Sequence, residues 1–253
     1  MISIKNEHEL EAMREACKIT AAARALAGKM VRPGVSTKAI DQAVHDYIVS
    51  QGAKPSFLNY SGYPASACIS VNSTVIHGIP GHYILKDGDI VSVDVGAYFK
   101  GFHGDCAATY ACGSISTEAQ KLIDVTRQSF FEGIRFAKKG MRVQDISHAV
   151  QTYVESNGFA VVRSFVGHGV GRNLHEEPEV PNFGNPGRGP RLLPGMTIAV
   201  APMVNAGSAA IRQMSDGWTV KTADGKNAAH YENTILITDG DPELLTDASD
   251  SLV

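Results

Sequence analysis

Apolar residues recur at helical spacing in four segments of the chain, which predicts four amphipathic helices. Two long patterns cover about residues 7–30 and 116–138, and a shorter pattern follows each of them, within residues 34–52 and 140–158. Runs rich in β-branched residues come after each pair and predict strands. The order helix, helix, strands thus occurs twice, and the sequence predicts an α+β fold with two similar halves.

The two shorter helical segments also share sequence. At an offset of 106, residues 34–52 and 140–158 have seven identities in 19 positions without a gap. Both segments begin and end with glycine, and Gly52 and Gly158 predict the same C-terminal cap for the two helices. We interpret this similarity as an internal duplication.

The strands after these helices extend the repeat. At an offset of 107, residues 85–94 align with residues 192–201, so that Asp94 and Ala201 are counterparts. A cleft between two such halves is a natural position for a functional site. We expect one catalytic domain, residues 1–253, built from halves of about residues 1–112 and 113–253.

Composition narrows the class of protein. The 253 residues are 43% hydrophobic and carry a formal net charge of -3, which excludes a disordered chain and disfavours a basic nucleic-acid binder. Four cysteines without a Cys-x-x-Cys pair indicate reduced thiols. Because no secretory signal and no membrane-spanning stretch is visible, we expect a cytoplasmic protein without a membrane partner, monomeric by default. The polar segment 247–253 is expected to pack loosely.

Two acidic residues in the middle of predicted strands indicate a cation site. Asp94 lies in the β-branched run 90–95, and Asp105 lies in the strand predicted after the Lys100-Gly101 turn. A turn centred on residues 99 and 100 places the two carboxylates opposite each other, whereas a turn one residue later makes the pair diagonal. In either case two buried like charges approach, and a cation between them relieves the repulsion.

Two further residues join this candidate site. Glu232 lies in another β-rich run, residues 229–238, and His168 lies among glycines that permit close approach of a ligand. Three carboxylates with one imidazole suit Mn, Fe, Co or Zn better than a structural thiolate zinc site. The sequence does not select among these metals.

Six motifs follow one another along the chain: HGIPG (77–81), VSVDVGAYFKGFHGDCAAT (91–109), VGHGVGRNLHEEP (166–178), PGMTIAVAPMVNAG (194–207), DGWTVKT (216–222) and YENT (231–234). They resemble the motifs of type I methionine aminopeptidases, and the resemblance extends from about residue 3 to about residue 245. It implies the pita-bread fold, whose halves have antiparallel sheets covered by helices. It also implies that a water bridging two divalent metal ions hydrolyses the first peptide bond and removes the initiator methionine of nascent proteins.

The resemblance implies a role for each metal-site residue. Asp94 would bind one metal ion, His168 would bind the other, and Asp105 and Glu232 would bridge both. Two cations so held lower the pKa of a bridging water and polarise the scissile carbonyl.

Other residues would act on the substrate. His77 and His175 would not bind metal; they would hydrogen-bond the substrate and stabilise the tetrahedral intermediate. Aromatic edges and a soft sulfur suit the thioether of a methionine side chain. The residues implied to line that pocket are Phe57, Tyr60, Tyr63, Cys68, Leu174 and Trp218.

One position departs from the family pattern, which has Glu where this chain has Ala201. Three carboxylates supply a charge of -3 to two divalent ions, whereas the four carboxylates of the family pattern supply a charge of -4. We therefore expect one ion to be weakly bound or absent and turnover to be severely reduced. Ala201 is either an engineered inactivating substitution or a natural feature of a paralogue that binds without cleaving, and the otherwise intact site favours the first.

Other proteins with the pita-bread fold suggest alternative functions for this chain. Xaa-Pro peptidases and creatinase carry an additional N-terminal domain, for which this chain has no room. The alternative function is a catalytically inactive pita-bread protein that binds peptides or the ribosome. We interpret the basic pairs Lys138-Lys139 and Arg188/Arg191 as solvated surface rather than as a ribosome contact.

Overall fold

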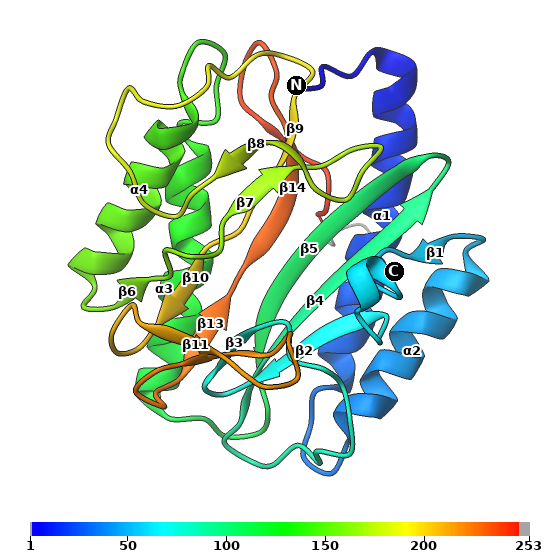
Figure 1. The fold of residues 1–253 in the computed structure, drawn as a ribbon, viewed down its shortest axis with the longest axis vertical. Helices are drawn as coiled ribbons and strands as arrows, with labels where there is room; N and C mark the ends of the chain where they lie inside the picture. The colour runs from blue at the N-terminus through cyan, green and yellow to red at the C-terminus, as the bar shows by residue number, and fades with distance from the viewer. Residues whose placement is uncertain (1, 248–253) are drawn as a thin grey trace.

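The computed structural model describes residues 2–247; Met1 and residues 248–253, which include nearly all of the polar C-terminal segment, lie outside it. The four predicted helices are confirmed as α1 (Glu7–Met30), α2 (Thr37–Ser50), α3 (Thr117–Ile134) and α4 (Val143–Ser156). Figure 1 shows α1 and α2 on the right of the molecule and α3 and α4 on the left, with the strands between the two pairs. The duplication seen in the sequence is therefore visible as two helix pairs that flank one set of strands.

The repeated helices α2 and α4 end in the same way. Gly52 and Gly158 follow them with φ angles of 72° and 87°, in the left-handed region that favours glycine. Their buried faces also correspond, because Ile40 and Val44 in α2 and their counterparts Ile146 and Val150 in α4 are at most 1% exposed. The helices α2 and α4 pack into different hydrophobic clusters, one in each half.

The strands are mostly short, and their recorded pairings are antiparallel. In chain order they are β1 (Lys54–Pro55), β2 (Ala67–Val71), β3 (Thr74–Ile76), β4 (Ile90–Phe99), β5 (Phe102–Ala111), β6 (Ala160–Val161), β7 (Gly167–Gly169), β8 (Glu176–Val180), β9 (Thr197–Val200), β10 (Met203–Asn205), β11 (Ile211–Gln213), β12 (Val220–Thr222), β13 (Ala228–His230), β14 (Glu232–Leu236) and β15 (Glu243–Leu244). A short 3-10 turn, Tyr60–Gly62, lies between β1 and β2.

One large sheet joins the two halves. Within residues 2–247 it has nine strands, seven of them in the order β1-β4-β5-β14-β9-β7-β8, with β2 paired to β4 and β15 to β14. The pair β5·β14 crosses from the first half to the second. Smaller sheets, β13-β10-β6 and β11-β12-β3, complete the strands. This confirms the predicted α+β class with antiparallel sheets.

The β4–β5 hairpin turns one residue later than a turn centred on residues 99 and 100. Asp94 pairs with Ala107 and Asp105 pairs with Gly96, so the two carboxylates are diagonal and not directly opposite. The turn residues Lys100 and Gly101 both have positive φ, 49° and 89°, as in the type I′ turns that match the twist of a hairpin. The diagonal alternative is thus the correct one.

The structure also bears on the expected reduced cysteines and on the expected absence of a membrane-spanning segment. Cys17, Cys68, Cys106 and Cys112 are buried and unpaired in the part of the chain that the structure describes. Among those residues, none of the helices has the length and apolarity needed to cross a membrane.

Gly104 allows α1 to lie directly on β5, next to the candidate ligand Asp105. A Cβ atom at Gly104 would lie 2.8 Å from Cys17 Cα and 2.6 Å from Thr20 Oγ1, both in α1. We predict that Gly104→Ala lowers the free energy of unfolding by about 1–3 kcal/mol, because the α1 backbone must shift. Urea denaturation measures this change.

Gly81→Ala is the matched control, because a Cβ at Gly81 meets no atom within 4 Å. Its free energy of unfolding should stay close to that of the parent chain. Equal stability of the two variants would contradict the packing argument.

Candidate active site

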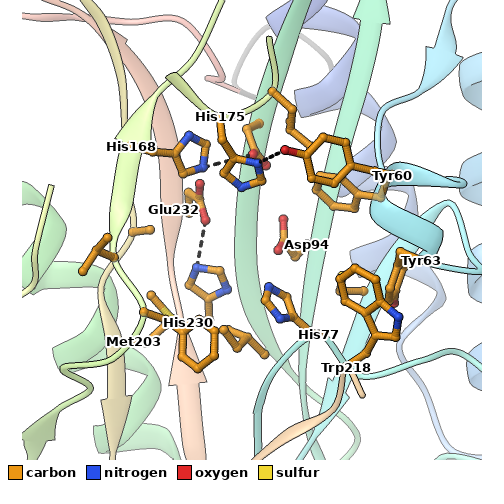
Figure 2. A pocket seen from close by; sticks show the side chains of 18 of the residues that line it. Tyr60, Tyr63, His77, Asp94, His168, His175, Met203, Trp218, His230 and Glu232 are labelled. Carbon is orange, nitrogen blue, oxygen red and sulfur yellow. Dashed lines mark hydrogen bonds and ion pairs between the residues drawn. The ribbon is translucent and has the colours of Figure 1, made fainter. Parts of the chain in front are cut away.

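The residues singled out in the sequence come together around one cavity of about 290 Å³. Its lining includes the four candidate metal ligands, the two candidate catalytic histidines, the six candidate pocket residues and Ala201. Figure 2 shows labelled side chains of both halves, among them Asp94, His168 and Glu232, directed into this space. The cavity thus lies where the duplicated halves meet.

The carboxylates are brought together by the register of three neighbouring strands. Asp94 in β4 and Glu232 in β14 both pair with Ala107 of β5, one from each side. Residues in register across a sheet point to the same face, and Asp105 shares that face because it lies two residues before Ala107. The methyl group of Ala107 between the two acidic side chains leaves room for a ligand above it.

Two overlapping groups of side chains have the geometry of metal ligands. One consists of Asp94, His230 and Glu232, and the other of Asp105, His168 and Glu232; within each group the ligand atoms lie within 4.8 Å of one another. His168 Nε2 lies 3.6 Å from Asp105 Oδ2, and its Nδ1 is 2.8 Å from the carbonyl oxygen of Gly169, which leaves Nε2 directed at the carboxylates. Glu232 belongs to both groups and is placed to bridge them.

Several ligand atoms have no other partner. Asp94 Oδ1, Asp105 Oδ1 and His230 Nε2 are buried and make no hydrogen bond within residues 2–247. Buried polar atoms are normally hydrogen-bonded, and each exception needs an explanation. Carboxylate oxygens and imidazole nitrogens that share one small space are the donor set of a divalent cation, so these residues fit the metal site that the sequence predicts.

The titration of the carboxyl groups reflects their burial. Burial, reinforced by the negative charge of Glu232, raises the pKa of Asp94 to about 7 and raises that of Asp105 well above its usual range. Burial acts on Glu232 in the same direction, but its contact with the His230 imidazole and the nearby imidazoles of His168 and His175 together lower its pKa. Without a cation the site therefore retains protons near neutral pH.

Two histidines stand beside the carboxylates in neutral form. Burial lowers the pKa values of His77 and His175 to about 4. Tyr60 Oη lies 2.8 Å from His175 Nδ1 and orients that ring, which is 4.2 Å from the ring of His168 between centroids. His77 has a φ of 57°, in the left-handed region that is rare for a residue with a side chain.

The opposite wall of the cavity is apolar. Phe57, Tyr63, Cys68 and Leu174 are buried in one cluster, and Trp218 packs against it. The rings of Tyr63 and Trp218 meet edge to face at 5.2 Å, and the Tyr63 hydroxyl donates to the carbonyl oxygen of Gly78 at 3.0 Å. Figure 2 shows Tyr63 and Trp218 facing the acidic side chains across the cavity. A ligand would meet charge at one end and an aromatic surface at the other.

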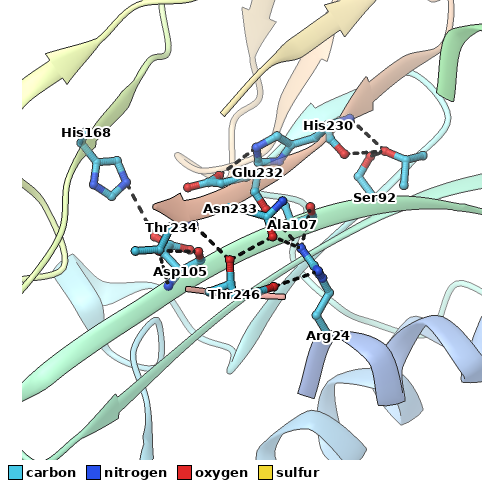
Figure 3. A network of polar contacts seen from close by, with 11 residues as sticks. Arg24, Ser92, Asp105, Ala107, His168, His230, Glu232, Asn233, Thr234 and Thr246 are labelled. Atoms are coloured by element: carbon cyan, nitrogen blue, oxygen red, sulfur yellow. Dashed lines mark hydrogen bonds and ion pairs between the residues drawn. The ribbon is translucent and has the colours of Figure 1, made fainter. Parts of the chain in front are cut away.

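Threonine hydroxyls fix the backbone at two of the ligand positions (Figure 3). Thr109 in β5 accepts from His230 N and donates to His230 O, both at 2.9 Å. Thr234 in β14 accepts from Asp105 N at 3.2 Å and donates to Asp105 O at 2.8 Å. These reciprocal bonds connect the strands of the two halves and hold the ligand residues in place.

His230 is the residue that the sequence analysis missed. It lies two residues before Glu232, at the spacing that places two side chains on the same side of an extended chain. A His-x-Glu pattern in a β-rich run was the signal that could have identified it.

Comparison with known proteins agrees with this geometry. The model of metallopeptidase family M24 matches residues 11–239. Over 246 residues, 97% of this chain and 99% of each relative, the chain is 56% identical to a methionine aminopeptidase of Clostridium perfringens and 51% identical to methionine aminopeptidase 1 of Bacillus subtilis. The crystal structure of a methionine aminopeptidase from Thermotoga maritima matches with a TM-score of 0.96 at 44% identity, over 98% of this chain and 100% of that one. The expected pita-bread fold is confirmed.

The raised carboxyl pKa values predict that cation binding releases protons. Asp94 and Asp105 hold protons below their raised pKa values and lose them above, and a cation needs the ionised form. The affinity for Mn²⁺ should therefore increase with pH, up to about tenfold per pH unit for each proton released.

Calorimetric titration of the metal-free protein near about pH 6, in two buffers of different ionisation enthalpy, measures the protons released. The apparent binding heat should differ between the buffers. Identical heats, with an affinity that does not change with pH, would show that the carboxylates are already ionised.

Proposed function

The chain belongs to metallopeptidase family M24 and, within it, to the methionine aminopeptidases, and from this premise we propose that it removes the N-terminal methionine of proteins by metal-dependent hydrolysis of the first peptide bond. The observation that carries the proposal is the single cavity with unpaired carboxylate and imidazole atoms on one wall and an aromatic wall facing them. The halves act together as one catalytic domain, because the pair β5·β14 joins them.

We assign Asp94, Asp105, His168 and Glu232 as metal ligands. Asp94 would hold one ion, His168 would hold the other, and Asp105 and Glu232 would serve both; of these, Glu232 belongs to both ligand groups and Asp105 to the group of His168. Divalent ions at these positions lower the pKa of a shared water and polarise the scissile carbonyl. The identity of the ions is open among Mn, Fe, Co and Zn.

The remaining residues bind the substrate and stabilise the negative charge that develops on its carbonyl oxygen. Neutral His77 and His175 can each donate one hydrogen bond, and both line the cavity beside the carboxylates. A donor in a partly dry site stabilises the oxyanion that develops when the carbonyl is attacked. The cluster around Tyr63 and Cys68 receives the thioether side chain, for which aromatic edges and sulfur are good partners.

The assay is release of methionine from Met-Ala-Ser by metal-free protein to which Mn²⁺, Co²⁺, Fe²⁺ or Zn²⁺ is added. We expect cleavage only with added metal, and loss of cleavage for Asp105→Asn, since this side chain belongs to a ligand group and its Oδ1 has no other partner. Lys-Ala-Ser should not be cleaved, because the aromatic wall offers no partner for an ammonium group in exchange for its hydration. Cleavage in the presence of EDTA would refute the metal-dependent mechanism.

Ala201 leads us to propose reduced turnover. Its side chain is 3% exposed at the cavity wall, directly after β9, and packs with Ile76 and Met203. A methyl group there neither binds metal nor contacts the attacking water. The ions are then balanced by the -3 of Asp94, Asp105 and Glu232, and the ion at His168 lacks one carboxylate.

We predict that Ala201→Glu raises kcat for Met-Ala-Ser at least about tenfold and tightens binding of one metal ion, because it restores a charged ligand. Ala201→Gln is the control, since it adds the same volume without the charge. Steady-state kinetics and metal titration measure both effects. Equal rates for the three proteins would refute the proposed defect.

The second candidate function, a peptide binder without catalysis, is favoured only by the Ala201 position itself. It predicts that peptides with N-terminal methionine bind to the metal-loaded Ala201→Glu variant and stay intact. Chromatographic analysis of the same incubations distinguishes the two functions.

A further inference from the structure

We propose that His230 is a metal ligand, so that the ion held by Asp94 and Glu232 has an imidazole of its own. The proposal rests on the metal centre of the proposed function and adds a donor to it. The centre then consists of three carboxylates and two imidazoles, with His230 in one ligand group and His168 in the other. Glu232 is common to both groups.

The contacts of His230 point to a missing third atom. Its Nε2 lies 2.9 Å from Glu232 Oε2, a contact that is an ion pair only when the imidazole is protonated, and Nε2 makes no hydrogen bond within residues 2–247. Asp94 Oδ1, from the same group, is equally without a partner. His230 Nε2 and Asp94 Oδ1 are both buried without a hydrogen bond and belong to one ligand group with Glu232, so the three side chains are arranged to bind one common centre.

The backbone holds this imidazole in position. Thr109 binds both the N–H and the carbonyl of His230, and the Thr109 hydroxyl also lies 2.8 Å from Ser92 Oγ in β4. His230 is 3% exposed and in register with Met203 of β10. Figure 3 shows the His230 ring beside Glu232. The ring therefore has little freedom to turn away from the carboxylates.

A structural role for His230 as partner of Glu232 is the competing explanation. A hydrogen bond between the two would satisfy Nε2, but it would leave Asp94 Oδ1 buried and unpaired. Metal ligation accounts for both atoms at once. It also has a consequence that an ion pair lacks, because a second imidazole shifts preference from Mn²⁺ toward Co²⁺ and Zn²⁺.

His230 also bears on the Ala201 position. Both residues line the cavity. The imidazole of His230 belongs to the Asp94 group, so it adds a coordination bond to that ion and not to the ion at His168, which lacks the carboxylate. It supplies no negative charge. The proposal therefore predicts one ion with an added neutral ligand and a second ion that is still short of a carboxylate.

The experiment is titration of metal-free protein with Co²⁺, followed by calorimetry and by visible absorption, for the parent chain and His230→Gln. Glutamine keeps a side chain of similar reach and removes the imidazole. We expect one Co²⁺ to bind at least about tenfold more weakly, a changed visible spectrum, and a smaller loss with Mn²⁺. His8→Gln, an exposed position on α1, is the control and should behave like the parent.

A measurement on the unchanged protein covers the case in which His230→Gln does not fold. X-ray absorption at two Co²⁺ per chain counts the imidazoles in the first coordination shell. About one imidazole per cobalt supports ligation by His230, and about half as many, from His168 alone, overturns it.

The outcomes separate this inference from the proposed function. Cobalt binding with the same affinity and spectrum in His230→Gln overturns the role of His230 and leaves the aminopeptidase proposal intact. Weakened cobalt binding in that variant, with no methionine release by the parent or by Ala201→Glu, supports His230 and refutes catalysis. A parent chain that binds no Co²⁺ overturns both.

Discussion

Three carboxylates buried between two halves of one sheet set the main physical constraint on this molecule. Asp94, Asp105 and Glu232 share one face of β4, β5 and β14, and the ion pairs recorded for them within residues 2–247 are with imidazoles only. Like charges so placed are unfavourable in a low-dielectric interior. The site can relieve this by retaining protons or by binding cations, and its unpaired oxygen atoms favour cations.

The rest of the fold supplies the rigidity that such a site needs. The two helix pairs contribute to different hydrophobic clusters, α1 also packs with Ala199 and Leu236 of the second half, and the β5·β14 pair joins the halves. Arg24 of α1 reaches this junction and donates to Asn233 Oδ1 at 2.9 Å and to Glu232 O at 3.2 Å (Figure 3). Because the ligand residues are held through their backbones, their side chains stay close in spite of their mutual repulsion.

The sequence predicted what depends on local periodicity. The four helices follow from apolar residues at helical spacing, and the strand positions of Asp94 and Asp105 follow from β-branched runs on either side of the Lys100-Gly101 turn, all of which neighbouring residues determine. The duplication follows from identities between residues 34–52 and 140–158. The exact hairpin register was open by one residue, because the turn conformation at Lys100 and Gly101 decides it. The alignment of Asp94 and Glu232 on Ala107 involves strands more than a hundred residues apart, and no local pattern contains that register.

In the proposed metal centre, His230 would supply coordination without negative charge. The duplication makes Ala201 the counterpart of Asp94, so the second half lacks a carboxylate at the position where the first half has one. The second half instead contributes two imidazoles, which provide ligand atoms without adding negative charge. A centre built in this way can hold its ions by geometry while leaving more of their positive charge uncompensated. Uncompensated charge weakens retention of the ions but strengthens their pull on a carbonyl oxygen, so affinity and catalysis need not change in proportion at this site.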